Sequence, residues 1–234
     1  MTAAMHPPLS TPQSPPKSTP RSTPQPTPVH TQAVADRAAS SPVVEALYGG
    51  RPVLLVGPDS GLVLLAAATA TTEGVAWAVR HSTGLLRAVV EPARAEALRL
   101  PSMGGVDRRH RGPLQAVAVD AVGTGTGISA ASRARTLRVL AAPATTPDDL
   151  LAPGHVLVEL AGTEARPTAA GAVADAAVRL CARAGLPAVA ALADVLDAAG
   201  EPLDPARMRE LADAESLPLL TVPVSVPTPE RTSS

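Results

Sequence analysis

Short apolar runs and longer amphipathic segments alternate along most of the chain. The runs Pro52–Val56 and Leu85–Val90 have the length of strands and are bounded by turn-forming residues, which favours buried strands. Thr72–His81 fits a helix, because Thr71 or Thr72 can cap its first turn and an acidic residue follows there. Since strands and helices interleave in this way, the sequence predicts a layered α/β domain.

The same pattern continues through the rest of the domain, which we place at residues 41–223. The other predicted strands are Leu62–Ala68, Leu114–Ala121, His155–Leu160, Val189–Val195 and Leu217–Val222. The other predicted helices are Val43–Tyr48, Pro92–Leu100, Ile128–Leu140, Thr168–Ala184 and Asp204–Ser216.

Residues 1–40 differ from the domain in composition. Nine prolines lie between Pro7 and Pro28, among many Ser, Thr and Gln residues. Too few apolar residues are present to offset the entropy of ordering, so we expect a disordered tail with polyproline II character. Its Ser-Thr-Pro triplets suit a docking or phosphorylatable segment, and an inert solubilising extension is the simpler interpretation. We also expect residues 224–234 to be frayed.

Composition excludes several classes of function. The chain has 234 residues and a formal net charge of -1, with one Cys, one Trp, one Tyr and no Phe. One Cys excludes a disulfide framework and a cysteine-rich zinc site. The small net charge and the few aromatic residues argue against nucleic-acid binding. No apolar run is long enough to span a membrane, so we expect a soluble, cytoplasmic protein.

Several short stretches follow one another in an order that resembles a known family. They are Arg80–Leu85, Leu98–Met103, Val119–Ala121, Thr126–Arg133, Pro147–Leu150, Pro153–Val156, Ala184–Leu186 and Leu219–Val222. The most specific pair is Thr-Gly-Ile-Ser-Ala, followed about 25 residues later by Pro-Gly-His-Val. Together these stretches resemble the 3,4-dihydroxy-2-butanone 4-phosphate synthases of riboflavin biosynthesis.

The resemblance implies a fold, an assembly and a reaction. The fold is an α/β sandwich around a mixed β-sheet, and the assembly is a homodimer with active sites at the subunit interface. The family reaction converts ribulose 5-phosphate to formate and 3,4-dihydroxy-2-butanone 4-phosphate with magnesium or manganese. Such chemistry needs a cation to polarise oxygens and positioned acids and bases to move protons.

The sequence departs from the family at the expected metal ligands. The family's acidic loop after the first strand is shortened here, and Asp59 is its only acidic residue. In the second metal motif Val173 replaces the histidine, Asp175 replaces the glutamate and Ala170 replaces a phosphate-binding arginine, with Arg166 nearby. The sequence therefore assigns no ligand to either cation.

Three carboxylate or imidazole groups are the candidate catalytic residues. By resemblance His155 retains the family's essential histidine, Asp194 stands for an essential glutamate, and Asp175 keeps a carboxylate in the second metal motif. A histidine that only hydrogen-bonds locally and a strand-end carboxylate facing solvent are the alternatives for His155 and Asp194. A cysteine common in the family is Arg87 here.

Thr126, Ser129 and Arg133 are the candidate substrate-binding residues. They belong to a glycine-rich turn before a predicted helix, where backbone N–H groups can cradle a phosphate. A tight turn and helix cap, with Gly125 and Gly127 supplying backbone freedom, is the alternative.

Two further features have simpler explanations. The basic run Arg108–Arg111 can attract a phosphate, although a solvated loop is more common. Cys181 on the Ala-rich helix is expected to be a small core residue.

Three functional hypotheses follow. The chain is a divergent synthase, or a non-catalytic paralogue that acts as a dimer partner or regulator of an intact synthase, or an enzyme repurposed to a metal-independent reaction on another sugar phosphate. The second accounts for the retained fold motifs and the shortened acidic loop together. The third would use His155 with Asp175 or Asp194.

Overall fold

The computed structural model describes residues 42–57, 61–103, 113–162 and 168–223. The strands are β1 (Val53–Val56), β2 (Gly61–Ala66), β3 (Arg87–Val90), β4 (Leu114–Ala121), β5 (Leu150–Leu160), β6 (Val189–Asp194) and β7 (Leu219–Thr221). The α-helices are α2 (Pro42–Tyr48), α3 (Thr72–His81), α4 (Pro92–Ala97), α5 (Ala130–Ala141), α6 (Ala169–Arg183) and α7 (Pro205–Glu215). Two 3₁₀ turns are η1 (Ala67–Thr69) and η2 (Pro147–Asp149).

The seven strands form one mixed sheet in the order β4-β5-β3-β6-β2-β1-β7. β1 pairs in parallel with β7 and β3 in parallel with β5. The remaining neighbours, β1 with β2, β2 with β6, β3 with β6 and β4 with β5, are antiparallel. The predicted α/β class is therefore confirmed, with parallel and antiparallel pairs in one sheet.

Side-chain caps fix where the helices begin. Thr71 rather than Thr72 caps α3, and its hydroxyl accepts a hydrogen bond from Gly74 N. Thr168 caps α6 in the same way, and Asp204 caps α7 through two backbone N–H groups. Each cap satisfies N–H groups that have no partner within the helix. Since a cap lies next to the helix that it begins, these starts could be predicted from the sequence.

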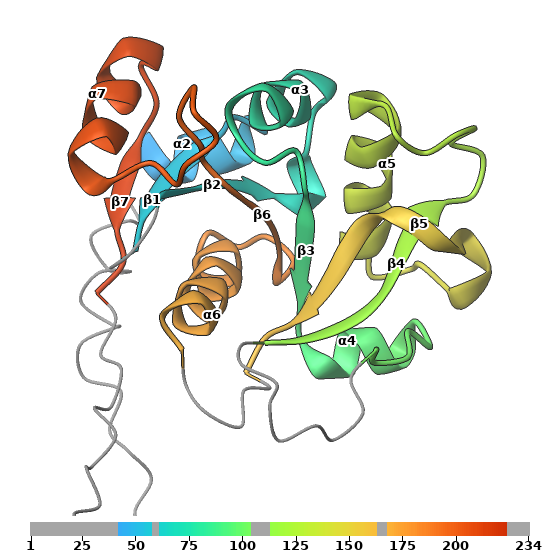
Figure 1. Cartoon of the computed structure of the whole chain (residues 1–234). Coiled ribbons are helices and arrows are strands. Elements are labelled where there is room, and N and C mark those ends of the chain that lie inside the picture. The colour runs from blue at the N-terminus through green and yellow to red at the C-terminus, as the bar shows by residue number, and fades with distance from the viewer. Residues whose placement is uncertain (1–41, 58–60, 104–112, 163–167, 224–234) are drawn as a thin grey trace, which may run out of the picture.

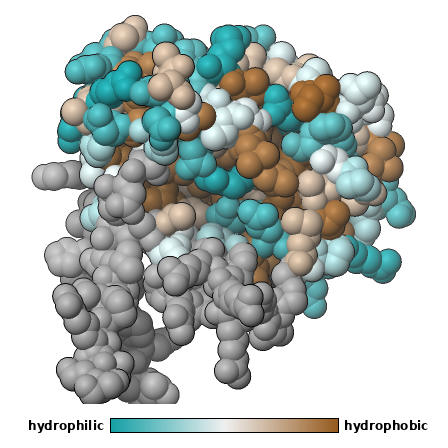
Figure 2. Space-filling view, in the orientation of Figure 1, coloured by the Kyte–Doolittle hydropathy of each residue, from teal (hydrophilic) through white to brown (hydrophobic). Residues whose placement is uncertain are grey.

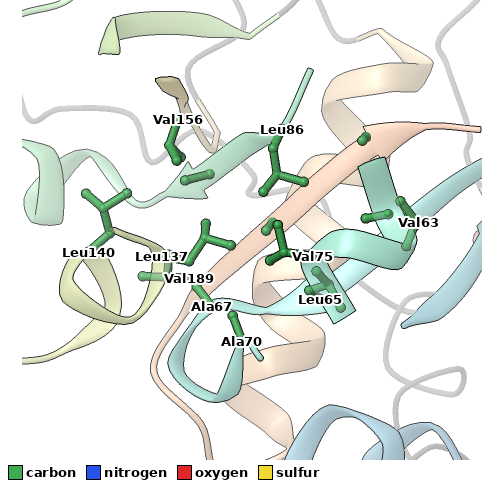
Figure 3. Packing of buried hydrophobic residues seen from close by; sticks show 14 of the residues in the cluster. Val63, Leu65, Ala67, Ala70, Val75, Leu86, Leu137, Leu140, Val156 and Val189 are labelled. Atoms are coloured by element: carbon green, nitrogen blue, oxygen red, sulfur yellow. The ribbon is translucent and has the colours of Figure 1, made fainter. Parts of the chain in front are cut away.

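The sheet separates two hydrophobic clusters. One face packs against side chains of α3, α5 and α7, and the other against α2 and α6. Figure 1 shows α6 on the opposite side of the sheet from α3 and α5. Figure 3 shows the first cluster, where Leu137 and Leu140 of α5 meet Val156, Val189 and their neighbours. Because successive side chains of a strand point to opposite faces of the sheet, a single strand can contribute apolar residues to both clusters.

Strand β5 begins five residues earlier than the predicted start at His155. Asp120 pairs with Leu151 but Val119 pairs with Val156, so four residues of β5 bulge out between these pairs. The bulge contains Pro153, whose peptide bond with Ala152 is cis, and Gly154. Pro and Gly normally indicate a strand end, but a bulge accommodates them within a strand.

The predicted N-terminal tail and the last eleven residues lie outside the described part of the chain. Within the described part, no helix combines the length and apolar character needed to cross a membrane.

Candidate functional site

Asp120 and His155 form a closely bonded pair at the bulge between β4 and β5. Asp120 Oδ2 lies 2.7 Å from His155 Nδ1, and Oδ1 accepts a hydrogen bond of 3.0 Å from the backbone N–H of His155. The Asp120 side chain is 11% exposed and that of His155 is 41% exposed. An ionised carboxylate only accepts hydrogen bonds, so we assign the proton to Nδ1. Nε2 is then the proton-accepting nitrogen, on the more exposed group of the pair.

Two glycines, which have no side chain, make room for the contact between Asp120 and His155. A Cβ atom on Gly127 would overlap the Asp120 carboxylate and lie 2.7 Å from His155 Nδ1. A Cβ atom on Gly154 would overlap Val119 C and Asp120 N and lie 2.5 Å from Val119 O. Gly127 also has φ +78°, a conformation that favours glycine. The glycines of both motifs therefore permit the contact between Asp120 and His155.

The turn from β4 to α5 is tied together by its own hydroxyl groups. Thr124 Oγ1 donates to Ala121 O, and Ser132 Oγ donates to Thr124 O. Ser129 caps α5 and accepts a hydrogen bond from Ser132 N. Thr126 and Ser129 are both exposed. The predicted turn and cap are present, and both side chains lie at the N-terminus of α5, next to Gly127.

Arg133, in the first turn of α5, is buried. Its Nη1 donates to Gly84 O at 2.8 Å, while its Nε has no hydrogen-bond acceptor among the described residues. Only 6% of the residue is exposed, and burial lowers the pKa of its guanidinium, which still remains cationic. Arg133 thus joins α5 to the Arg80–Leu85 turn, and its position is beside the site rather than on its surface.

Arg87 lies between two carboxylates on the neighbouring strands. Its Nη1 donates to Asp194 Oδ2 at 2.7 Å, and its Nε lies 3.4 Å from Glu159 Oε2. The second contact is an ion pair without the alignment of a hydrogen bond. The Arg87 side chain is 18% exposed, Glu159 8% and Asp194 32%. Arg87 therefore links β5, β3 and β6 through side chains.

Strand register brings His155 and Asp194 to the same end of the sheet. Arg87 lies opposite Leu157 of β5 and Leu192 of β6. His155 precedes Leu157 by two residues, and Asp194 follows Leu192 by two. Because β3 and β5 are parallel and β6 runs the other way, His155 and Asp194 both flank the start of β3, of which Arg87 is the first residue. Figure 2 shows one face of the molecule, in the orientation of Figure 1, as a mosaic of apolar and polar residues.

Asp175 lies elsewhere. Its Oδ1 accepts a hydrogen bond of 2.7 Å from Gly162 N, just after the C-terminal end of β5. The strand from His155 to Leu160 alone spans about 16 Å. The structure therefore does not bring Asp175 together with His155, but uses it to join α6 to the end of β5.

The described residues do not fit a magnesium or manganese site. Among them, no group of three or more His, Cys, Asp or Glu side chains is placed to hold a metal ion. Val173 is 1% exposed within the apolar cluster that α6 forms with the sheet. Asp59, Arg166 and the basic run Arg108–Arg111 lie outside the described residues.

Sequence reasoning missed the partners of its candidate residues. Asp120 appeared only as a motif position, Arg87 only as a replaced cysteine, and Glu159 not at all. The bulge that unites Asp120 with His155 leaves one signal, a Pro-Gly pair inside a strand. No sequence signal marks Glu159, because its pairing with Arg87 depends on the order of strands in the sheet.

Comparison with known proteins gives consistent results. The model of the family described as 3,4-dihydroxy-2-butanone 4-phosphate synthase matches residues 41–224. A synthase of Pyricularia oryzae is 37% identical over 161 residues, which are 66% of this chain and 69% of that protein. The riboflavin biosynthesis protein RibBA of Salinispora tropica is 36% identical over 181 residues, 75% of this chain and 45% of RibBA. The chain thus spans less than half the length of that relative.

Solved structures show the same fold. A 3,4-dihydroxy-2-butanone 4-phosphate synthase in complex with two magnesium ions is 33% identical, with a TM-score of 0.70 over 76% of this chain and 90% of that one. The enzyme of Candida albicans is 27% identical, with a TM-score of 0.67 over 76% of this chain and 90% of that one. The chain therefore belongs to the 3,4-dihydroxy-2-butanone 4-phosphate synthase family of riboflavin biosynthesis.

Proposed function

We propose that the chain binds a sugar phosphate, with ribulose 5-phosphate as the first candidate, and that His155 moves a proton on it. The observation that carries this proposal is the 2.7 Å contact between His155 Nδ1 and Asp120 Oδ2. A buried carboxylate fixes the orientation and tautomer of the ring. The exposed side of the imidazole then has a defined proton acceptor, which is the requirement for general acid–base catalysis.

The family reaction supplies a first step that this arrangement can perform. Enolisation of a ketose phosphate removes a proton from a carbon next to the carbonyl group. In our proposal His155 Nε2 accepts that proton, and Asp120 stabilises the imidazolium that forms through Nδ1–H. Thr126 and Ser129, at the N-terminus of α5, bind the phosphate with the help of nearby backbone N–H groups. Arg133 contributes by joining α5 to Gly84 through a hydrogen bond to its carbonyl oxygen. Because the described residues do not fit a cation, we derive no step through one.

The first test is proton exchange followed by formate release. Purified protein is incubated with ribulose 5-phosphate in deuterated water, with magnesium, with manganese or with EDTA, and both deuterium uptake and formate are measured. We expect deuterium uptake at the carbon next to the carbonyl group, and we expect His155→Ala to reduce it by orders of magnitude. Metal-dependent formate would extend the proposal to the full family reaction. Absence of exchange in every condition from folded protein would overturn it.

A second candidate function is that of a non-catalytic partner of an intact synthase. It is supported by Val173, which is buried in the core at the position where resemblance places a metal-binding histidine. It is also supported by exposed apolar side chains around the site, including Leu85, Ile128 and Leu151, each more than half exposed. Such residues suit an interface with a second synthase-like chain, either a copy of this one or an intact synthase.

Analytical ultracentrifugation distinguishes these assemblies. The chain is sedimented alone and after mixing with an intact family synthase. A dimer of this chain supports the homodimer, and a mixed species that raises or lowers the synthase's formate production supports the regulatory role. Monomers in both experiments would contradict this second function.

A further inference from the structure

The ion cluster of Arg87 has unused hydrogen-bonding capacity. Arg87 uses Nη1 and Nε toward Asp194 and Glu159, and Asp194 uses Oδ2 toward Arg87. Within the described part of the chain, Arg87 Nη2 and Asp194 Oδ1 take part in no hydrogen bond. The 18% and 32% exposure of these two side chains leaves them partly open. A donor and an acceptor therefore remain available on two bonded side chains.

The charges around Arg87 favour neutral oxygens over an anion. The guanidinium is already shared by two carboxylates, so a phosphate dianion placed there would also meet both negative charges. A hydroxyl group differs in this respect, because it donates to a carboxylate oxygen and accepts from a guanidinium N–H. Two neighbouring hydroxyls on a carbon chain would match one acceptor next to one donor.

The position of the pair fits the rest of a sugar phosphate bound at His155. His155 and Asp194 flank the start of β3, and Arg87 is the first residue of that strand. Diagonal neighbours in a regular sheet are about 7–8 Å apart at Cα, a separation that a five-carbon chain spans together with its terminal hydroxyl and phosphate groups. The pair and the imidazole can therefore contact different carbons of one molecule.

We propose that Arg87 and Asp194 bind a vicinal diol of the substrate, so that Arg87 helps to determine which sugar phosphate is accepted. This inference rests on the proposed function. It assigns Asp194 to hydrogen-bonding of hydroxyls and leaves proton transfer to His155. Arg87 becomes a binding residue although it occupies the place of a family cysteine.

Calorimetric titration of two ligands into three forms of the full chain tests the proposal. Ribulose 5-phosphate carries a vicinal diol, whereas dihydroxyacetone phosphate carries a phosphate and a hydroxyketone without one. Asp194→Ala removes the acceptor, and Asp194→Asn keeps the shape should the first variant not fold. Asp197→Ala is the matched control, because Asp197 forms a comparable 2.8 Å ion pair with Arg207 outside the site.

The expected result is a loss of discrimination. The wild-type chain and Asp197→Ala should bind ribulose 5-phosphate about tenfold more tightly than dihydroxyacetone phosphate, since two hydrogen bonds are at stake. Asp194→Ala should bind both equally, with unchanged affinity for dihydroxyacetone phosphate; Asp194→Asn should lose part of the preference. Equal binding of both ligands by the wild-type chain, or an equal loss of both in the Asp194 variants, would overturn the diol site alone. Binding of neither ligand by the wild-type chain would overturn the proposed function as well.

Discussion

The two ends of β5 differ in how the polar side chains next to them are used. At the N-terminal end, a bulge, two glycines and a buried carboxylate hold the His155 ring in one orientation. At the C-terminal end, Asp175 binds a backbone N–H and Val173 packs into the core. The first end has the features of a proton-transfer site, whereas the second has those of a helix docked on a sheet. The carboxylate of Asp120 thus orients a partly exposed imidazole, whereas the carboxylate of Asp175 joins a helix to the sheet.

The largest expected effect concerns the N-terminal end. We predict that His155→Ala lowers deuterium exchange into ribulose 5-phosphate by about 10²–10⁴-fold, the usual contribution of a general acid or base. Asp120→Asn should cause a smaller loss, because the ring keeps a hydrogen-bonding neighbour but loses the charge. Exchange rates measured by NMR check both variants, and His81→Gln is the control, because that half-buried ring at the end of α3 stacks on Trp77. An unchanged exchange rate in His155→Ala would show that the N-terminal end of β5 does not transfer the proton.

Glycine substitutions compare the two ends by stability. We predict that Gly154→Ala lowers the free energy of unfolding by about 3 kcal/mol, because the new Cβ meets the backbone of β4. Gly162→Ala, at the other end, meets nothing within 4 Å but has φ +66°, so we expect about 1 kcal/mol. Urea unfolding of both variants measures the difference. Equal losses of unfolding free energy in the two variants would show that the backbone around Gly154 shifts easily to make room for a Cβ atom.

Some features of the fold and of the candidate site could be predicted from the sequence alone, and others could not. Helix starts were predictable because caps such as Thr71 and Thr168 act within one turn, and the glycine motifs marked the turns near the site. The pairing of Asp120 with His155, and of Arg87 with Glu159, was not predictable from local patterns. Both pairs depend on strand order and on a register shift, which join residues far apart in the chain. The sequence therefore named His155 and Asp194 as candidates but did not predict the residues that hold them.

A substitution in α6 tests whether the C-terminal end of β5 can hold a cation. Val173→His places an imidazole in an apolar cluster, and we predict a loss of about 2 kcal/mol in the free energy of unfolding. Val173→Ala, which creates a small cavity instead, is the control for lost packing. Neither magnesium nor manganese should restore the stability of Val173→His in thermal unfolding. Recovery with either cation would mean that this end remains a latent metal site.

The smallest effect at neutral pH concerns Cys181. Burial raises the pKa of its thiol from 9.0 to about 12, so the folded chain should resist alkylation by iodoacetamide at pH 8 and react only after unfolding. A raised pKa of this kind adds stability that is complete below the unfolded value and is lost as the pH rises from 9 through about 12. Cys181→Ala should remove that part of the alkaline pH dependence, and mass spectrometry counts the alkylated thiol. Rapid labelling of folded protein would contradict the packing of α6.

The bulge opposite Asp120 also bears on aggregation. β4 is an edge strand of eight residues, and a long straight edge exposes N–H and C=O groups to any extended chain. Ser102 bridges to Ala116, and Val117 N donates to Pro101 O, so the first half of this edge is already paired. The second half contains the register shifts that bring His155 to Asp120. The irregularity that positions the imidazole therefore leaves little regular edge on which another molecule could add a strand.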